Sequence, residues 1–333
     1  MKSRLGLYLP FIVLACLAAI WSGVWYYASS KTEAVITQTL LKEATNGRLW
    51  TCPNRNVSGF PFRIEVTCDA PTFTSKKDGK SGSGALAGSG ALAGLSVQAR
   101  IADPTRAIAV LKSPLKIEAE NGLIDIGWQD AKTSLSGSND SLGEFSLDMS
   151  QVSVSIKPPQ GQPLSGTIAR LNINLAQDFD TAQQATTPIS APFKLLTKLD
   201  GVAFAPLDAI TSTPQPLNLE LQLRATNVPL KPASNRDTAL ETWRAAGGSV
   251  SIALFEINKG TLHLDAKGDL ALDNEHKPAG KIALNFQGLE KIFTQLGMSS
   301  LSALGGGSKL SLNLKNGKVF LGPIPVLNLQ PLY

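Results

Sequence analysis

The feature that most constrains this chain is residues 5–27, a run without a single charged side chain. A helix rises about 1.5 Å per residue, so about 20 apolar residues cross the roughly 30 Å hydrocarbon core of a bilayer. Inside lipid every backbone polar group needs an internal partner, which makes a helix the expected form of a single span. Pro10 lies in the first turns, where a missing donor matters least. We therefore expect residues 1–28 to form an N-terminal transmembrane anchor.

The flanks of this run predict its orientation. Lys2 and Arg4 precede it, and positive residues favour the cytoplasmic side. Aromatic residues are enriched at the two membrane interfaces; here they are Tyr8 at the near end and Trp21, Trp25, Tyr26 and Tyr27 at the far end. We expect a single-pass protein of the inner (cytoplasmic) membrane, with its N-terminus in the cytoplasm and the bulk of the chain in the periplasm.

Two other interpretations of residues 5–27 compete with an uncleaved anchor. A secretory signal peptide has a short apolar region and a small-residue cleavage site, but here the apolar run continues through Trp25. Residues 13–16 also resemble a lipoprotein processing box in which Cys16 would be acylated, yet the residues that follow are again apolar. We prefer the uncleaved anchor.

The charge balance outside the span excludes one class of partner. Outside the anchor there are 29 basic residues, which is 31 less Lys2 and Arg4, against 26 acidic ones. This small excess, without a block of like charges, does not indicate nucleic-acid binding. His263 and His276 are the two histidines, so there is little material for a metal centre or a histidine-based active site. We expect no cofactor.

Two cysteines, Cys52 and Cys68, lie outside the apolar run. An even pair in an exported domain predicts a structural disulfide. The alternative is two free thiols or a redox pair, but the spacing is not that of a Cys-x-x-Cys motif. The disulfide agrees with the orientation expected from Lys2 and Arg4.

The rest of the chain divides into a short helical stalk and a large β domain. Residues 29–49 have helical spacing, with Gly47 as a stop signal, and residues 50–333 are rich in strand patterns. Within the β domain, residues 75–94 contain a tandem Ser-Gly-Ala-Leu-Ala-Gly repeat, which we interpret as a flexible insertion. A weaker boundary falls at 180–215, among Pro-rich connectors.

Period-two alternation of apolar and polar residues dominates the β domain. It predicts ten to fourteen short, half-buried strands, largely in antiparallel meanders. Asn-Gly pairs at 121–122 and 316–317 predict hairpin turns, and the phase of alternation changes near residues 150–151, which predicts a bulge or turn. Helical interruptions are expected at 192–200, 236–246 and 288–297. The fold class is therefore mainly β, with the N-terminal transmembrane helix followed by a large, mostly antiparallel, curved sheet or sandwich and a few short helices.

No catalytic motif is found in the sequence. There is no Gly-x-Ser-x-Gly elbow and no His-Glu-x-x-His pair. His263 lies on the polar side of a strand pattern and His276 in a polar segment that predicts a turn. Asp265 and Asp269 could be paired into an acid/base site only by guesswork, and Trp128 and Trp243 are expected to be packing residues. We assign no catalytic, cofactor-binding or metal residue and expect no enzymatic activity; Cys52 and Cys68 are the only site residues predicted.

Two segments carry a family resemblance. Residues 57–68, Val-Ser-Gly-Phe-Pro-Phe-Arg-Ile-Glu-Val-Thr-Cys, and the segment from Leu314 to Tyr333 resemble a family of uncharacterised proteobacterial membrane-anchored proteins, a domain of unknown function. The hexapeptide repeat departs from that family. In architecture the chain is also loosely similar to AsmA-like envelope proteins, which present long curved sheets to lipid. Neither resemblance implies an activity for any residue.

The sequence pattern is compatible with two classes of function. The first is a membrane-anchored periplasmic binding or scaffold protein of the cell envelope, which holds lipid or another envelope protein along an apolar face. A regulator or assembly partner of a membrane complex would give the same sequence pattern. The second is a periplasmic hydrolase with an unrecognised active site, which requires polar residues to converge in a pocket.

Overall fold

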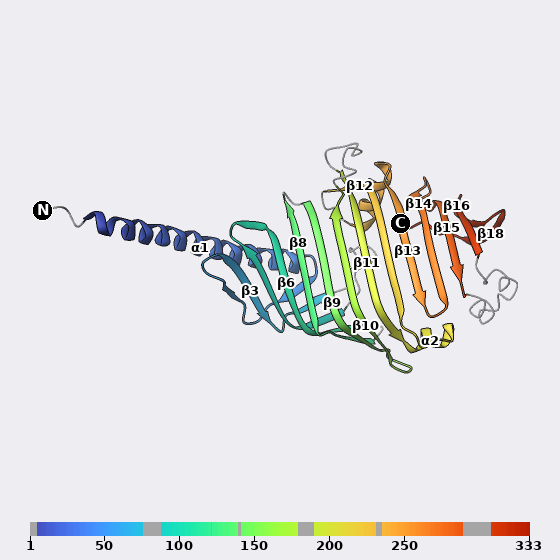
Figure 1. Cartoon of the computed structure of the whole chain (residues 1–333), viewed down its shortest axis with the longest axis horizontal. Coiled ribbons are helices and arrows are strands. Elements are labelled where there is room, and N and C mark those ends of the chain that lie inside the picture. Colours follow the sequence, from blue (N-terminus) through green and yellow to red (C-terminus); the bar gives the residue numbers. More distant parts are fainter. Residues whose placement is uncertain are drawn as a thin grey trace.

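The computed structural model of this protein describes residues 5–75, 88–120, 122–138, 141–178, 190–230, 235–288 and 308–333. These residues form three helices and eighteen strands, and all the strands belong to one antiparallel sheet (Figure 1). The expectation of a mainly β fold with a large antiparallel sheet behind an apolar N-terminal helix is confirmed.

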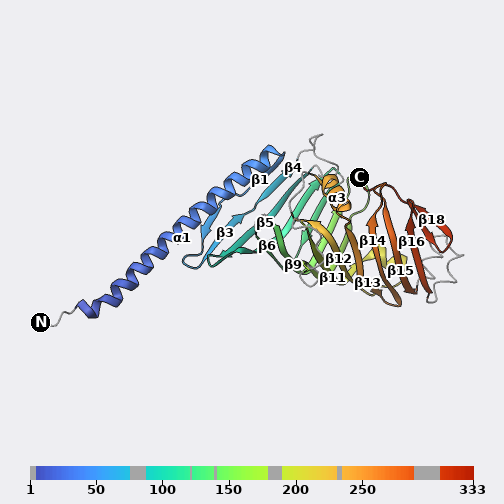
Figure 2. The ribbon, with the colours of Figure 1, turned by 90° about the horizontal axis from the view of Figure 1, so that it is seen from above.

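Helix α1 (Leu5–Thr45) unites the expected anchor and stalk in one continuous helix. It is the one helix of the described residues long and apolar enough to cross a membrane, with a mean hydropathy of 1.9 in its most apolar window. The helix ends just before Gly47, whose φ of 75° suits glycine. Its N-terminal end projects away from the sheet, and the rest of the helix lies along the edge that contains β1 (Arg48–Thr51) and β3 (Arg63–Asp69), as Figure 2 shows.

The remaining strands follow in chain order along the sheet. They are β2 (Asn56–Ser58), β4 (Thr72–Ser75), β5 (Gly88–Arg100), β6 (Asp103–Ala119), β7 (Gly122–Gly127), β8 (Asp130–Ser138), β9 (Ser141–Lys157), β10 (Leu164–Gln177), β11 (Ser190–Phe204), β12 (Leu217–Pro229), β13 (Ser249–Lys259), β14 (Leu262–Leu272), β15 (Pro278–Gln287), β16 (Ser308–Lys315), β17 (Lys318–Leu321) and β18 (Ile324–Asn328).

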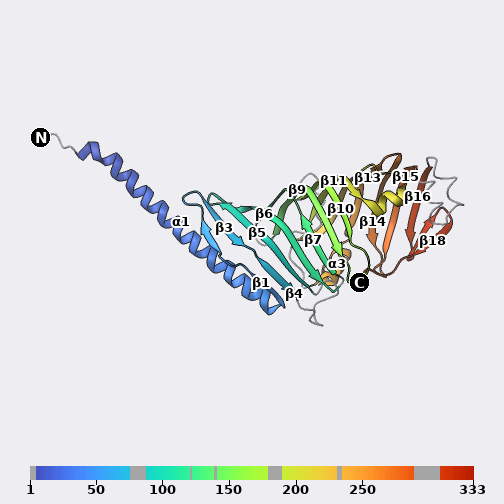
Figure 3. The same cartoon turned by 90° about the horizontal axis from the view of Figure 1, so that it is seen from below.

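Strand pairing makes a long meander from the anchor outward. β5 pairs with both β3 and β4 along different parts of its length, and β6 likewise pairs with both β7 and β8. From β9 to β18 every strand pairs with the next one along the chain. In the described residues β18 pairs with β17 alone, and β2 with β3 alone, so the described strands do not close into a barrel. Figure 3 shows the resulting long, twisted sheet.

Several strands are longer than the sequence pattern predicted. β6 and β9 each contain 17 residues and β11 contains 15, so the expectation of ten to fourteen short strands was wrong. At the phase change, β9 continues without a turn. Gln151 has a φ of 49° and lacks a register partner, while pairing with β10 keeps the same register on both sides.

The second copy of the hexapeptide repeat, residues 89–94, lies in β5, which corrects the prediction of a flexible insertion over 75–94. Its small residues allow close packing. A Cβ atom on Gly90 would lie 2.0 Å from the ring of Phe73, so the glycine is required by the aromatic side chain above it. Ser75 belongs to β4, and residues 76–87 lie outside the described residues.

The predicted helix at 192–200 was also wrong, because this segment lies in β11 and pairs with β10 on one side and β12 on the other. The sheet is thus continuous through the described part of 180–215. The helix expected at 236–246 is confirmed as α3 (Arg236–Ala245), which Asn235 caps by accepting a hydrogen bond from the Thr238 N–H. A short helix α2 (Ala205–Thr211) was not predicted. The helix expected at 288–297 falls almost wholly on residues outside the described part of the chain.

A small core lies where β6 changes partner. Trp128 is buried there, and its indole N–H donates to the main-chain oxygen of Leu111 over 2.9 Å. Ala131, Met149 and Val152 complete the cluster. Trp243 packs α3 onto the sheet by donating to the main-chain oxygen of Thr226. The expectation that both tryptophans are packing residues is confirmed.

Candidate functional site

One row of directly paired residues crosses thirteen strands without a polar side chain. Residues directly opposite one another in antiparallel strands project to the same face of a sheet. We call this row the apolar row, and it runs through Ile64, Ala99, Ala107, Leu135, Phe145, Leu175, Leu195, Leu223, Ile252, Gly268, Ile282, Leu312 and Leu321. It begins at β3, beside α1, and reaches β17 near the far end of the sheet. One face of the sheet is therefore apolar over almost its whole length.

The opposite face carries a matching row of charged and amide side chains, which we call the charged row. Its residues are Lys132, Asp148, Asn172, Lys198, Glu220, Glu256, Asp265, Asn285 and Lys309. Lys198 and Glu220 form an ion pair of 2.9 Å, and the Lys198 ammonium holds the pKa of the Glu220 carboxyl below its usual range. The sheet thus has one face suited to water and one suited to an apolar partner.

The apolar row is not sealed into a core. None of its thirteen residues is fully buried, and Leu135 is 51% exposed. In a closed sandwich the central rows would be covered by a second layer about 10 Å away. Among the described residues, nine apolar side chains are fully buried; four of them form the cluster around Trp128, and the other five lie on five different strands. The central part of the apolar face is therefore accessible in this part of the chain.

An apolar hollow of about 360 Å³ lies on this face near one end of β10–β13. Its lining is entirely apolar and comprises Leu142, Leu175, Phe193, Leu195, Leu223, Ala225, Val228, Pro229, Leu230 and Val250. Three members of the apolar row thus lie inside it. A volume of this size is in the range of small-ligand pockets, and a lining without charged or hydroxyl groups suits a hydrocarbon chain rather than a polar substrate.

Charged side chains lie on the opposite face of the same strands, because Lys194 and Arg224 alternate with the hollow residues Leu195 and Leu223. Asp178 follows β10 and has a side chain only 1% exposed; the Lys194 ammonium lies 2.6 Å from its carboxylate, and the Arg224 guanidinium lies 3.9 Å away. The Asp178 N–H donates to the main-chain oxygen of Pro192, next to the hollow residue Phe193. A buried carboxylate requires such partners. The charged groups at this end of the strands therefore lie across the sheet from the hollow.

The two histidines are not brought together. His263 is part of β14, where its Nδ1 lies 2.6 Å from the Asn258 oxygen and its Nε2 lies 3.5 Å from Asp265. Asp265 also accepts a hydrogen bond from Asn285, and Asp269 pairs in register with Lys281. His276 lies in the turn between β14 and β15, against different residues. The structure therefore brings His263 and Asp265 together on β14, whereas His276 and Asp269 lie against other residues, so the four do not converge on one site.

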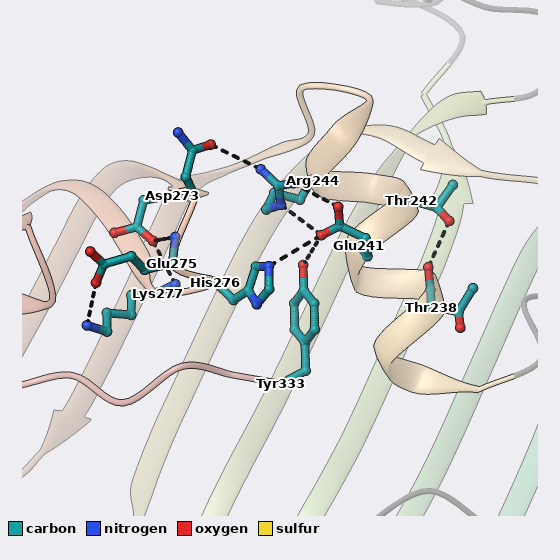
Figure 4. A network of polar contacts seen from close by, with 10 residues as sticks. Thr238, Glu241, Thr242, Arg244, Asp273, Glu275, His276, Lys277 and Tyr333 are labelled. Carbon is teal, nitrogen blue, oxygen red and sulfur yellow. Dashed lines mark hydrogen bonds and ion pairs between the residues drawn. The ribbon is translucent and has the colours of Figure 1, made fainter.

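His276 belongs instead to a polar network that joins three distant segments (Figure 4). Its ring stacks on Tyr333 with centroids 4.3 Å apart, and the Tyr333 hydroxyl donates to the Glu241 carboxylate over 2.7 Å. Arg244 of α3 donates twice to the same carboxylate. Arg244 and then Tyr333 hold the pKa of Glu241 down to about 2. Each of these four side chains is engaged with another member of the network, so its geometry fits a structural clamp.

Sequence reasoning did not find this network, because its members come together only in the folded chain. The predicted helix at 236–246 contains Glu241 and Arg244, but no local pattern joins Glu241 to His276 and Tyr333, which lie 35 and 92 positions further along the chain. Two further hydrogen bonds extend the network: Arg236 donates to the main-chain oxygen of Leu332, and the Leu332 N–H donates to the main-chain oxygen of His276. It fastens the segment around Leu332 and Tyr333 to α3.

The predicted disulfide is confirmed, since Cys52 and Cys68 are bonded with their Cα atoms 5.4 Å apart. Cys68 is buried in β3 and lies opposite Leu95 on the apolar face. A structural disulfide is typical of an oxidising compartment. Cys16 is exposed on α1 and unbonded. In the described part of the chain, no group of His, Cys, Asp and Glu side chains could hold a metal ion.

Fold and surface together define a class of protein: one long antiparallel sheet with an accessible apolar face, carried on an N-terminal helix long enough to cross a membrane. A family model described as an uncharacterised protein conserved in bacteria (DUF2125) matches residues 25–330. The chain belongs to this family, as its end segments suggested. Searches of curated proteins and of solved structures gave no match.

Proposed function

We propose that this protein is a membrane-anchored, periplasmic binding or scaffold protein of the cell envelope that holds lipid acyl chains along its apolar face. The observation that carries the proposal is the apolar row, which crosses thirteen strands and contains no fully buried residue. Exposed apolar surface costs roughly 25 cal/mol per Å² relative to burial. Soluble proteins rarely expose continuous apolar patches of this extent unless a partner or lipid covers them.

Lipid is the partner that the geometry favours. The hollow of about 360 Å³ has only apolar lining residues, and the row begins beside α1, which brings it close to the membrane. An acyl chain needs no polar partner for its binding, and the lining residues of the hollow offer no polar side chain. The continuous row offers a path along which a chain contacts apolar side chains at each strand.

The proposal also includes the orientation of α1 in the membrane. Lys2 and Arg4 precede the apolar half of α1, which favours a cytoplasmic N-terminus. The Cys52–Cys68 disulfide supports an oxidising compartment for the sheet. These observations support the proposal that α1 lies in the inner membrane and the sheet in the periplasm. We also propose that the protein is not an enzyme, which the separation of His263 from His276 supports.

The proposal can be tested with a pair of adjacent residues on β11. Leu195 lies in the apolar row and Leu196 projects to the opposite face, where it pairs with Asn174 and Gln222. We expect the full chain, purified from membranes in mild detergent, to retain lipid that mass spectrometry detects. Leu195→Gln together with Leu223→Gln should lower the retained lipid several-fold. Leu196→Gln is the control and should leave it unchanged. Equal lipid in all three proteins would contradict the proposal.

A further inference from the structure

The loop between β2 and β3 is fixed to the part of α1 expected to lie in the membrane. The indole N–H of Trp21 donates to the main-chain oxygen of Pro61, and that of Trp25 donates to the main-chain oxygen of Arg63, both over 2.8 Å. With a rise of about 1.5 Å per residue, Trp21 and Trp25 lie roughly 9 Å and 3 Å before Tyr27 along the helix. If α1 spans the bilayer, the loop therefore lies at the level of the membrane interface.

This loop presents two exposed aromatic rings at that level. Phe60 is 56% exposed and Phe62 is 71% exposed. The rings of Phe60 and Trp25 meet edge to face with their centroids 5.6 Å apart, and the ring centroids of Phe62 and Trp21 are 6.4 Å apart. Exposed phenylalanines are unfavourable in water but favourable where a protein surface meets acyl chains and headgroups. The four rings thus form an aromatic surface that suits the membrane interface.

A basic cleft adjoins the aromatic loop. It has a volume of about 340 Å³ and is lined by Arg63, Arg100 and Arg106 together with Gln98, Asp103 and Ile108. Its position is fixed to the loop, because Ile101 in the β5–β6 turn donates to the main-chain oxygen of Phe62. Guanidinium groups bind phosphate through paired hydrogen bonds. Three of them around one cleft are therefore suited to a phosphate-bearing ligand.

Carboxylates near the cleft engage two of the arginines in part. Glu65 lies 3.3 Å from Arg63, and Glu144 lies 3.2 Å from Arg106. Both arginine side chains are nevertheless 55% exposed, and a guanidinium has five N–H donors. Arg100 forms no ion pair with any described residue. Asp103 accepts a hydrogen bond from Thr105 and lies at the mouth of the same cleft. Donors thus remain for a phosphate.

We infer that this cleft binds the headgroup phosphate of an anionic phospholipid in the membrane that holds α1, while Phe60 and Phe62 contact its acyl region. The inference rests on the proposed membrane anchor. Arg63, Arg100 and Arg106 are the chain neighbours of Ile64, Ala99 and Ala107, so the arginines project to the face opposite the apolar row. The cleft thus lies at the same end of the sheet as the start of the row, but on the other face.

The test uses the full chain in nanodiscs that contain phosphatidylglycerol and phosphatidylcholine in equal amounts. Native mass spectrometry after removal of the discs counts the lipids of each kind that stay bound. We expect bound phosphatidylglycerol to exceed phosphatidylcholine by about fivefold or more, since one arginine near a membrane surface contributes about this factor. Arg100→Gln together with Arg106→Gln should return the ratio towards one.

The control removes the same charge from the charged face, away from the anchor. Lys132→Gln together with Arg170→Gln should keep the enrichment, because neither residue lines the cleft. A ratio near one in the unchanged protein, or an equal loss in both double variants, would overturn the inference. The retained-lipid difference between Leu195 and Leu196 variants is independent of headgroup charge. If that difference is observed while the phosphatidylglycerol ratio is near one, the headgroup site is wrong and the proposed acyl binding still holds.

Discussion

The indole of Trp25 donates a hydrogen bond to the main-chain oxygen of Arg63 over 2.8 Å, and this contact joins the anchor helix to the first long strand of the sheet. The next residue, Ile64, is the first member of the apolar row. The apolar face of the sheet therefore begins one residue from the point where the sheet contacts α1. This arrangement places a continuous apolar surface next to the expected membrane interface.

The Cys52–Cys68 bond should account for much of the stability of the sheet's first strands. It closes a loop with a sequence separation of 16, and in the chain-entropy model a loop of this size contributes about 3 kcal/mol. Cys52→Ser together with Cys68→Ser should lower the free energy of unfolding by about this amount in denaturant titrations. Intact-mass measurement with and without reductant should differ by two protons in the unchanged protein. Equal masses would contradict the bond.

A buried ion pair should hold α2 against the sheet. The Lys259 side chain is 1% exposed, and its ammonium lies 2.6 Å from the Asp208 carboxylate. Lys259→Met leaves that carboxylate without its partner and should lower the free energy of unfolding by about 2 kcal/mol. Adding Asp208→Leu removes the unpaired charge, so the double variant should recover part of the loss. A double variant as unstable as the sum of both single variants would show that the two residues are not coupled.

The clamp around Glu241 should make stability fall in acid. Arg244 and Tyr333 lower the pKa of Glu241 from an ordinary 4.5 to about 2. A group whose pKa is lowered by folding stabilises the fold above its unfolded pKa and loses that contribution on protonation. The contribution should therefore be complete above about pH 4.5 and disappear towards pH 2. Thermal midpoints measured across this range should decline less steeply in Glu241→Gln.

Glu275→Gln provides a matched control for the clamp. Glu275 lies in the same turn region as His276 and forms an ion pair of 2.7 Å with Lys277, but its side chain is 70% exposed. Ion pairs with so exposed a partner contribute little to stability. This variant should keep the acid dependence of the unchanged protein. An acid dependence that is the same in all three proteins would show that Glu241 does not carry it.

The sequence alone was sufficient to predict features that depend on a local repeating pattern of residues. Alternation such as Leu217, Leu219, Leu221 and Leu223 predicted both the strand and its apolar side, and the helix at 236–246 was also predicted, within one residue of the bounds of α3. The prediction of a helix at 192–200 failed because Leu195, Leu196 and Leu199 also satisfy helical spacing. β11 pairs with β10 on one edge and β12 on the other, and this pairing stabilises a strand rather than a helix.

Features that depend on how strands align could not be predicted in this way. The apolar row exists because thirteen strands share one register, and alternation within each strand says nothing about its neighbour's register. Small residues in β5 indicated flexibility, whereas Gly90 is needed for close packing beneath Phe73. Glu241 and Tyr333 are 92 residues apart in the chain, so their hydrogen bond has no local signal.

The central claim is that acyl chains occupy the apolar face, and photocrosslinking in native membranes tests it most directly. A photoreactive amino acid is placed at Leu195 in one protein and at its neighbour Leu196 in another, and each protein is purified after illumination. Mass spectrometry should find a phospholipid adduct at position 195 and little or none at position 196. Absence of lipid adducts at position 195, or equal adducts at both positions, would contradict the claim.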